Sequence, residues 1–177
     1  MLLTNEQICE IAETIDATSD TCYINSETGE VIFMMSNEKL RDYGISWDED
    51  EEDEEEQSEK VVNTFNADST NWQDEFYSSV KADMAKINSW EWKHTIRIEK
   101  PESHEAFTIM ERFVEEVIPE GRLKQDFWKA LSRSHPFRNF NAIVHNCAYR
   151  ENWFAFKQQA MEEYVRAKIN EHKIVHE

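Results

Sequence analysis

Glycine and proline are scarce in this chain. Its 177 residues include only 3 Gly and 3 Pro, where average usage would give roughly 12 and 9. Three glycines cannot supply the many tight turns of a β-sandwich or barrel, nor a glycine-rich loop around a phosphate. The composition therefore argues against an all-β fold, a Rossmann fold and a P-loop enzyme.

Cysteines and long apolar runs are also few. The three cysteines, Cys9, Cys22 and Cys147, are odd in number and lack CxxC spacing, which predicts reduced thiols rather than a disulfide framework or a zinc site. No run approaches the ~18 apolar residues that cross a membrane. The first residues also lack the basic and apolar regions of a secretory signal. We therefore expect a cytoplasmic protein without a membrane partner.

Basic residues are in the minority, and the charge is unevenly distributed. The chain has 19 Lys and Arg against 37 Asp and Glu, a net charge of −18. Residues 1–118 carry −21, whereas residues 119–177 carry +3 and the segment 122–150 alone carries +5. The net charge disfavours a general attraction to nucleic acid or to an anionic membrane. The basic segment keeps a local anion contact open.

Nine consecutive carboxylates occupy positions 48–56. Their mutual repulsion and the absence of apolar side chains predict an exposed, disordered linker over 46–60. An acidic segment that binds a partner is the alternative interpretation. A calcium loop is disfavoured because the central glycine and final glutamate spacing of an EF-hand is missing.

Hydrophobic periodicity predicts a mainly helical α+β protein. Apolar residues recur every three or four positions in seven segments, which we expect to be helices: 4–16, 36–43, 70–89, 103–118, 121–132, 136–147 and 151–172. Two β-rich runs, 21–25 and 30–34, flank a loop ending in Gly29, whose freedom at positive φ suits a hairpin with a bulge. Alternation over 90–98 predicts one further strand with its aromatic face inward.

The expected architecture is an N-terminal helix and hairpin packed on a C-terminal helical cluster. The aromatic stripes of the last two helices, Phe137 with Phe140 and Trp153 with Phe156, are interpreted as its core. We divide the chain into a helix and hairpin segment at 1–45, the acidic linker at 46–60 and a mainly helical segment at 61–177. The first and last segments are expected to form one globular domain.

Motifs that carry chemistry are missing. The sequence contains neither HExxH nor GxSxG, so it predicts no zincin site and no nucleophile elbow. His172 and His176 are four residues apart, a spacing that suits a metal ion, but a frayed chain end is the simpler interpretation. Cys147 and His145 are two apart on a helix and point to different sides. We therefore expect no catalytic residue, no metal ligand and no cofactor.

Basic and aromatic residues meet in the segment Arg133 to Asn141. Arg133 and Arg138 flank Phe137, and this mixture of cations and rings suits phosphate binding and base stacking. We name Arg133, Arg138, Lys129 and Arg150 as candidate contacts for an anion or a partner. The alternative is that Phe137 and Phe140 belong to the core and that Arg138 pairs with a carboxylate of the acidic half or caps a helix C-terminus.

Several short motifs carry a resemblance to a protein family. They are Ser26-Glu27-Thr28-Gly29-Glu30-Val31, Ile109-Met110-Glu111-Arg112-Phe113, Phe137-Arg138-Asn139-Phe140 and Trp153-Phe154-Ala155-Phe156. In this order, and with an acidic stretch after the hairpin, the chain resembles an uncharacterised bacterial family of the UPF series over about 1–60 and 90–170. The resemblance implies a small bacterial protein and assigns no activity, cofactor or catalytic residue.

These observations favour a non-enzymatic interaction or adaptor protein with a protein partner. One alternative is a nucleic-acid-associated regulator that uses the basic segment 122–150, with the acidic linker as a competitor for that surface. A second alternative is an enzyme whose site is assembled from scattered acids and histidines. The exposure and partners of Arg138 discriminate between a binding role and a structural role for the basic segment.

Overall fold

The structure is a computed structural model that describes residues 3–18, 20–42 and 71–175. Seven α-helices and one three-stranded antiparallel sheet occur in this part of the chain, which confirms the mainly helical α+β class. The predicted linker at 46–60 lies outside the described residues. The chain forms two compact units, one within residues 18–99 and the other from residues 3–17 with 100–177.

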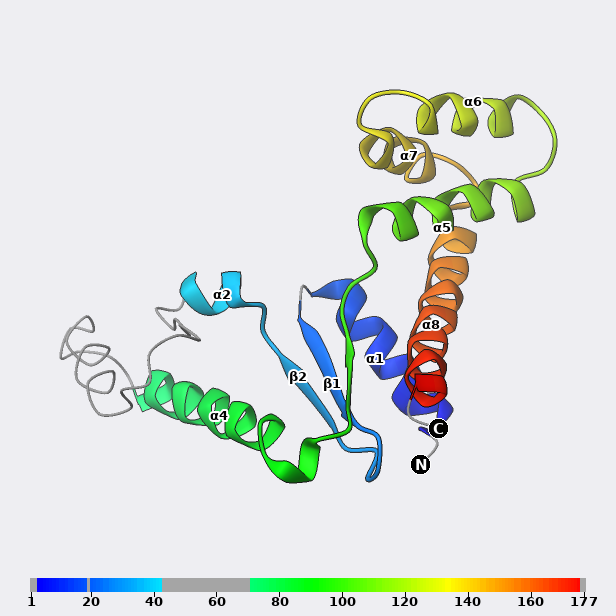
Figure 1. The fold of residues 1–177 in the computed structure, drawn as a ribbon. Helices are drawn as coiled ribbons and strands as arrows, with labels where there is room; N and C mark the ends of the chain where they lie inside the picture. Colours follow the sequence, from blue (N-terminus) through cyan, green and yellow to red (C-terminus); the bar gives the residue numbers. More distant parts are fainter. Residues whose placement is uncertain (1–2, 19, 43–70, 176–177) are drawn as a thin grey trace. The chain divides into compact units, whose positions relative to one another are not determined.

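The sheet of the first unit is built from the predicted hairpin and the further strand. Strands β1 (Thr21–Asn25), β2 (Val31–Met34) and β3 (Thr95–Ile98) run in the order β2-β1-β3 (Figure 1). Both pairings are antiparallel, so Cys22 lies opposite Phe33 on one side and Ile98 on the other. Gly29 ends the hairpin loop with a φ of 76°, the left-handed conformation that its position predicts.

The strand predicted over 90–98 is wrong in its first half. A single 3-10 turn, η1 (Trp90–Trp92), occupies those residues, and the strand begins only at Thr95. Because the turn replaces strand alternation, the Trp90 side chain is 78% exposed, whereas Trp92 is buried and only 3% exposed. The buried side chain of Asn25 stabilises this arrangement, since its Nδ2 donates to the carbonyl of Glu91 at 3.0 Å.

Two helices of the first unit lie within the described residues. They are α2 (Asn37–Asp42) and α4 (Asn71–Ile87), both labelled in Figure 1. Their apolar side chains form a small core with β2. The buried members of this core are Met34, Leu40 and Val80. Phe76 and Met84 pack against it, as the helical stripe predicts.

The second unit, called the helical unit below, contains five helices. They are α1 (Asn5–Ala17), α5 (Ser103–Glu116), α6 (Arg122–Leu131), α7 (Pro136–Val144) and α8 (Arg150–Val175) (Figure 1). Helix α1 packs along α8, while α5 contacts both α6 and α8, and α6 contacts α7. Helix α1 is therefore grouped with α8 here, whereas the hairpin that follows it belongs to the first unit. The single domain expected from 1–45 and 61–177 stays a prediction.

The N-terminus of α1 follows its sequence signature. The hydroxyl of Thr4 accepts from the Gln7 amide at 3.2 Å, and the Gln7 side chain accepts from the Thr4 amide at 3.0 Å, which is a reciprocal capping box. At the other end of the helix, Asp16 forms an ion pair with Lys157 of α8. These contacts fix both the start of α1 and its attachment to α8.

Aromatic rings form the core of the helical unit. Phe113 of α5 lies at its centre, with edge contacts to the rings of Phe127, Phe140, Trp153 and Phe156 at centroid distances of 5.1 to 6.3 Å. The prediction of an aromatic core is thus confirmed for Phe140 and Trp153, which are buried, and Phe156 packs against them.

Candidate functional site

A hollow of about 350 Å³ opens on the surface of the helical unit. Helices α1, α5, α7 and α8 and the segment before α5 contribute to it. Its apolar and polar lining residues include Asp16, Lys100, Ile109, Met110, Phe137, His145, Trp153, Phe154, Lys157 and Met161. The volume falls within the range of small ligand sites and of pockets that accept one large side chain.

Two phenylalanines that line the hollow remain exposed. Phe137 is 39% exposed and Phe154 is 42% exposed, so the expectation that Phe137 is a core residue is wrong. Phe137 occupies the second position of α7, directly after Pro136, and its ring contacts the edge of Phe107 at 6.5 Å instead of entering the core. A large apolar group left in water is costly unless something covers it.

The start of α7 sets the position of Phe137. His135 caps the helix in the left-handed conformation, with φ 58° and ψ 53°, and the Asn139 side chain donates to the carbonyl of Ser134 at 2.8 Å. Together with the fixed φ of Pro136, these contacts define the direction in which the helix begins. Phe137 therefore lies at the helix entrance, while Phe140 one turn later reaches the core.

Phe154 is exposed because it follows Trp153 by one residue. One residue is about 100° around a helix, so the two rings of α8 leave the axis in different directions. Phe154 lies 6.5 Å from the ring of His145, and the guanidinium of Arg150 lies 4.9 Å from its centroid. The Arg150 contact is a cation–π interaction.

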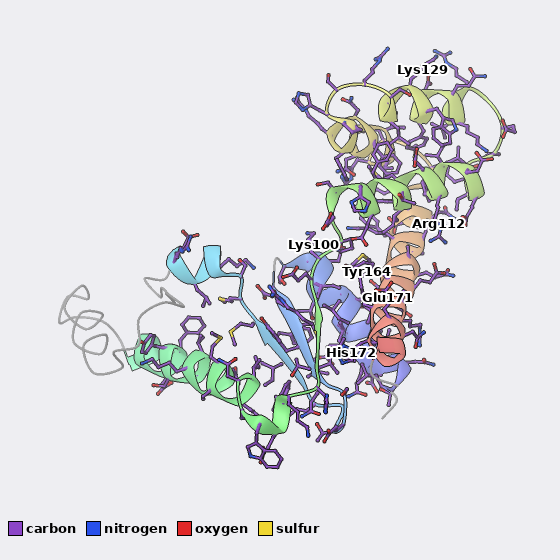
Figure 2. The ribbon with its side chains drawn as sticks, viewed as in Figure 1. Lys100, Arg112, Lys129, Tyr164, Glu171 and His172 are labelled. Atoms are coloured by element: carbon purple, nitrogen blue, oxygen red, sulfur yellow. The ribbon has the colours of Figure 1, made fainter. Side chains whose placement is uncertain are left out.

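The polar groups of the hollow give it a positive edge. Asp16 is paired with Lys157, with a shortest oxygen to Nζ distance of 2.6 Å. The ammonium of Lys100 donates to the backbone carbonyl of Asp16 at 3.1 Å, and it forms no ion pair with a carboxylate of the described residues. Figure 2 shows Lys100 on the stretch that leads into α5.

A second groove lies between α6 and α7. Its volume is about 410 Å³, and its lining includes Asp126, Lys129, Arg133, Asn139 and Ile143. The structure thus brings two predicted contacts, Lys129 and Arg133, to one groove, while Arg138 and Arg150 lie outside its lining. Lys129 extends from the outer side of α6 (Figure 2).

The four predicted contacts differ in their partners, although all are exposed. Lys129 lies 3.7 Å from Asp126, and Arg150 lies 2.9 Å from Glu151. Arg133 and Arg138 form no ion pair with any carboxylate in the described parts of the chain. The alternative in which Arg138 pairs with a carboxylate therefore finds no support among these residues.

Shifted pKa values are found at Cys9, Lys124 and Arg112, and each shift favours an unreactive form. Burial, followed by the hydrogen bond to Glu13, raises the pKa of the Cys9 thiol, so it stays protonated and a poor nucleophile. Hydrogen bonds to Glu120 and then Glu115 raise the pKa of Lys124, which keeps its ammonium charged. These shifts are opposite to those that activate a nucleophile.

Arg112 is the third shifted side chain. Its hydrogen bond to Glu116, and then those to Glu163, raise the pKa of its guanidinium. This residue links α5 to α8 and also lies over the ring of Phe156, 5.6 Å from its centroid. Arg112 therefore joins the two helices, and it is not among the residues that line the hollow.

Candidate metal ligands do not cluster in the described residues. This part of the chain holds no cluster of three or more His, Cys, Asp or Glu side chains suited to a metal ion. The Cys147 thiol lies 3.5 Å from the carbonyl of Val144 and donates to it. His176 lies outside the described residues. None of the described helices is long and apolar enough to cross a membrane.

The hollow could not be predicted from the sequence as a whole, because its residues come from distant segments. Lys100, Phe154 and Lys157 belong to no shared motif. One signal was present in the sequence. Phe154 lies one residue away from the apolar stripe of α8, so its position on the helix predicts an exposed ring.

Comparison with protein-family models gives no match for the chain, and neither curated proteins nor solved structures match it. The resemblance to an uncharacterised bacterial family stays a prediction.

Proposed function

We propose that this chain is a non-enzymatic interaction protein that binds a partner protein through the hollow of its helical unit. The observation that carries the proposal is the pair of exposed phenylalanines, Phe137 and Phe154, beside a concave apolar floor. Exposed aromatic rings next to a pocket are typical of the residues that dominate binding energy at protein interfaces. We also propose a cytoplasmic location, which the free thiols of the three cysteines favour.

A capture experiment tests the proposal. The full chain, a variant with both Phe137→Ala and Phe154→Ala, and a Trp90→Ala control are immobilised and exposed to native lysate. Trp90 is a matched control because it is a large exposed aromatic residue outside the hollow. We expect a protein that the wild type and the control retain and that the double variant loses. Equal recovery by all three chains contradicts the proposal.

A nucleic-acid-associated regulator is the second candidate, and the exposure of Arg133 and Arg138 favours it. Arginines with no carboxylate partner among the described residues are available for phosphates, and the run of carboxylates at 48–56 would compete for the same surface. Binding to single- and double-stranded oligonucleotides at low salt should strengthen when this run is replaced by neutral residues and weaken with Arg133→Gln and Arg138→Gln. Absence of binding in every case removes this candidate.

A further inference from the structure

The floor of the hollow suits one large apolar side chain. Ile109 and Met110 from α5 and Trp153 and Met161 from α8 line it. A volume of about 350 Å³ corresponds to roughly twelve water molecules at their liquid density. Methionine side chains adapt their shape to a guest and are common on surfaces that bind varied peptides. An entering apolar group would therefore displace water from a surface that adjusts to it.

The two exposed phenylalanines line this hollow from two different helices. Phe137 comes from α7 and Phe154 from α8, and both line the same hollow. Rings placed around an anchor pocket exclude water from the contact and strengthen it. The arrangement therefore fits a protruding side chain better than a flat apolar surface.

Charge defines the surroundings of that side chain. The Asp16 carboxylate is occupied by Lys157, whereas the hydrogen bond from Lys100 to the Asp16 carbonyl holds a cation that has no carboxylate partner among the described residues. In a chain with 37 acidic and 19 basic residues, this cation in the lining of an apolar hollow makes its edge complementary to a carboxylate.

We infer that the hollow accepts a protein segment in which one large apolar side chain is flanked by acidic residues. The inference rests on the proposed function and adds the chemistry of the partner. A nucleic acid is less suited to this place, because the net charge of −18 opposes a polyphosphate.

Labelled synthetic peptides test the inference with the full chain. Each peptide has twelve residues and one central Trp, flanked by Asp and Glu, by Gln, or by Lys. Fluorescence polarisation should show the acidic peptide binding about two- to fivefold more tightly than the Gln peptide, as expected for one partly exposed ion pair with Lys100. The Lys peptide should bind most weakly, and replacing Trp by Ser should abolish binding.

Variants assign the effect to the hollow. Lys100→Gln should remove the preference for the acidic peptide while leaving the Gln peptide bound, and Lys129→Gln, a basic residue outside the hollow, should leave the preference intact. The Phe137→Ala and Phe154→Ala double variant should weaken all peptides at least tenfold. Circular dichroism checks that each variant is folded, which the exposure of these side chains favours.

The outcomes separate this inference from the proposed function. Failure of all peptides, or equal binding of acidic and neutral ones, overturns the partner chemistry while a phenylalanine-dependent partner in the capture experiment still supports the interaction protein. Absence of such a partner overturns the proposed function. An oligonucleotide that displaces the bound peptide through Phe137 and Phe154 overturns the inference in favour of nucleic acid.

Discussion

Replacing Phe113 by Ala should lower the free energy of unfolding of the helical unit more than replacing Phe137 by Ala. The Phe113 side chain is fully buried and contacts four aromatic rings. Phe→Ala substitutions in cores destabilise by about 3–5 kcal/mol, because burial is lost and a cavity remains. Aromatic edge contacts add about 0.5–1.5 kcal/mol each, so we expect Phe113→Ala near the upper end of that range.

The matched control is Phe137→Ala in the same unit. Phe137 is 39% exposed and has one ring contact, with Phe107 at 6.5 Å. Full burial of a Phe side chain contributes about 1.5–3 kcal/mol, so partial burial should make this substitution cost about 1–2 kcal/mol. The contrast between the two variants isolates the central position of Phe113 from the loss of an aromatic ring as such.

Urea unfolding with hydrogen-exchange mass spectrometry of α5 and α8 measures both costs within the helical unit. Should Phe113→Ala fail to fold, Phe113→Leu retains much of the side-chain volume and should cost about 1–2 kcal/mol. If Phe113→Ala costs no more than Phe137→Ala, or if Phe113→Leu is as stable as the wild type, the aromatic cluster is not the core that holds these helices together.

Three further predictions concern single side chains. The hydrogen bond to Glu120, with that to Glu115, raises the pKa of Lys124 in the folded chain. The charged Lys124 therefore stabilises the fold fully below the pKa of the unfolded chain, near 10.5, and this stabilisation is lost as pH rises through the folded pKa. The difference in unfolding free energy between wild type and Lys124→Gln should therefore stay constant from pH 6 to 9 and shrink above about pH 10.5, and a constant difference to pH 12 contradicts this. Iodoacetamide should alkylate Cys9 slowly at pH 8, and Glu13→Gln should accelerate the reaction in a mass-spectrometric time course; unchanged rates count against the shift. Asn25→Ala should destabilise by about 2–3 kcal/mol in urea unfolding, because the amides of Glu27 and Thr28 and the carbonyl of Glu91 lose their bonds, and a cost below about 0.5 kcal/mol refutes that role.

Most helices could be predicted because their local signals agree with the packing that buries them. The capping box at Thr4 marks the start of α1, and Gly29 marks the end of the hairpin loop. The strand predicted over 90–98 was wrong where a long-range contact decides the conformation. Asn25, on a distant strand, binds the carbonyl of Glu91 and stabilises the 3-10 turn that interrupts the alternation. No pattern within 90–98 contains that information.

The site was less predictable than the fold. Arg138 is exposed and has no carboxylate partner among the described residues, which matches one of the two alternatives that the sequence leaves open. Phe137 shows the limit of the periodicity argument, because three-residue spacing from Phe140 predicts a shared face but says nothing of where the helix begins. The first turn of α7 lies beyond the rings of the core, so the same face is buried at Phe140 and exposed at Phe137.

Only some of the basic side chains in segment 122–150 form ion pairs with carboxylates of the described residues. Lys124 is buried, with only 6% of its surface exposed, and it forms ion pairs with Glu115 and Glu120. Arg122 and Lys129 both form ion pairs with Asp126. Arg133 and Arg138 then remain at the surface with no carboxylate of the described residues. Exposed ion pairs contribute little to stability, so folding alone does not require these two arginines to be basic. Their charge is therefore available to a negatively charged partner, which the nucleic-acid proposal and the acidic-segment inference both require.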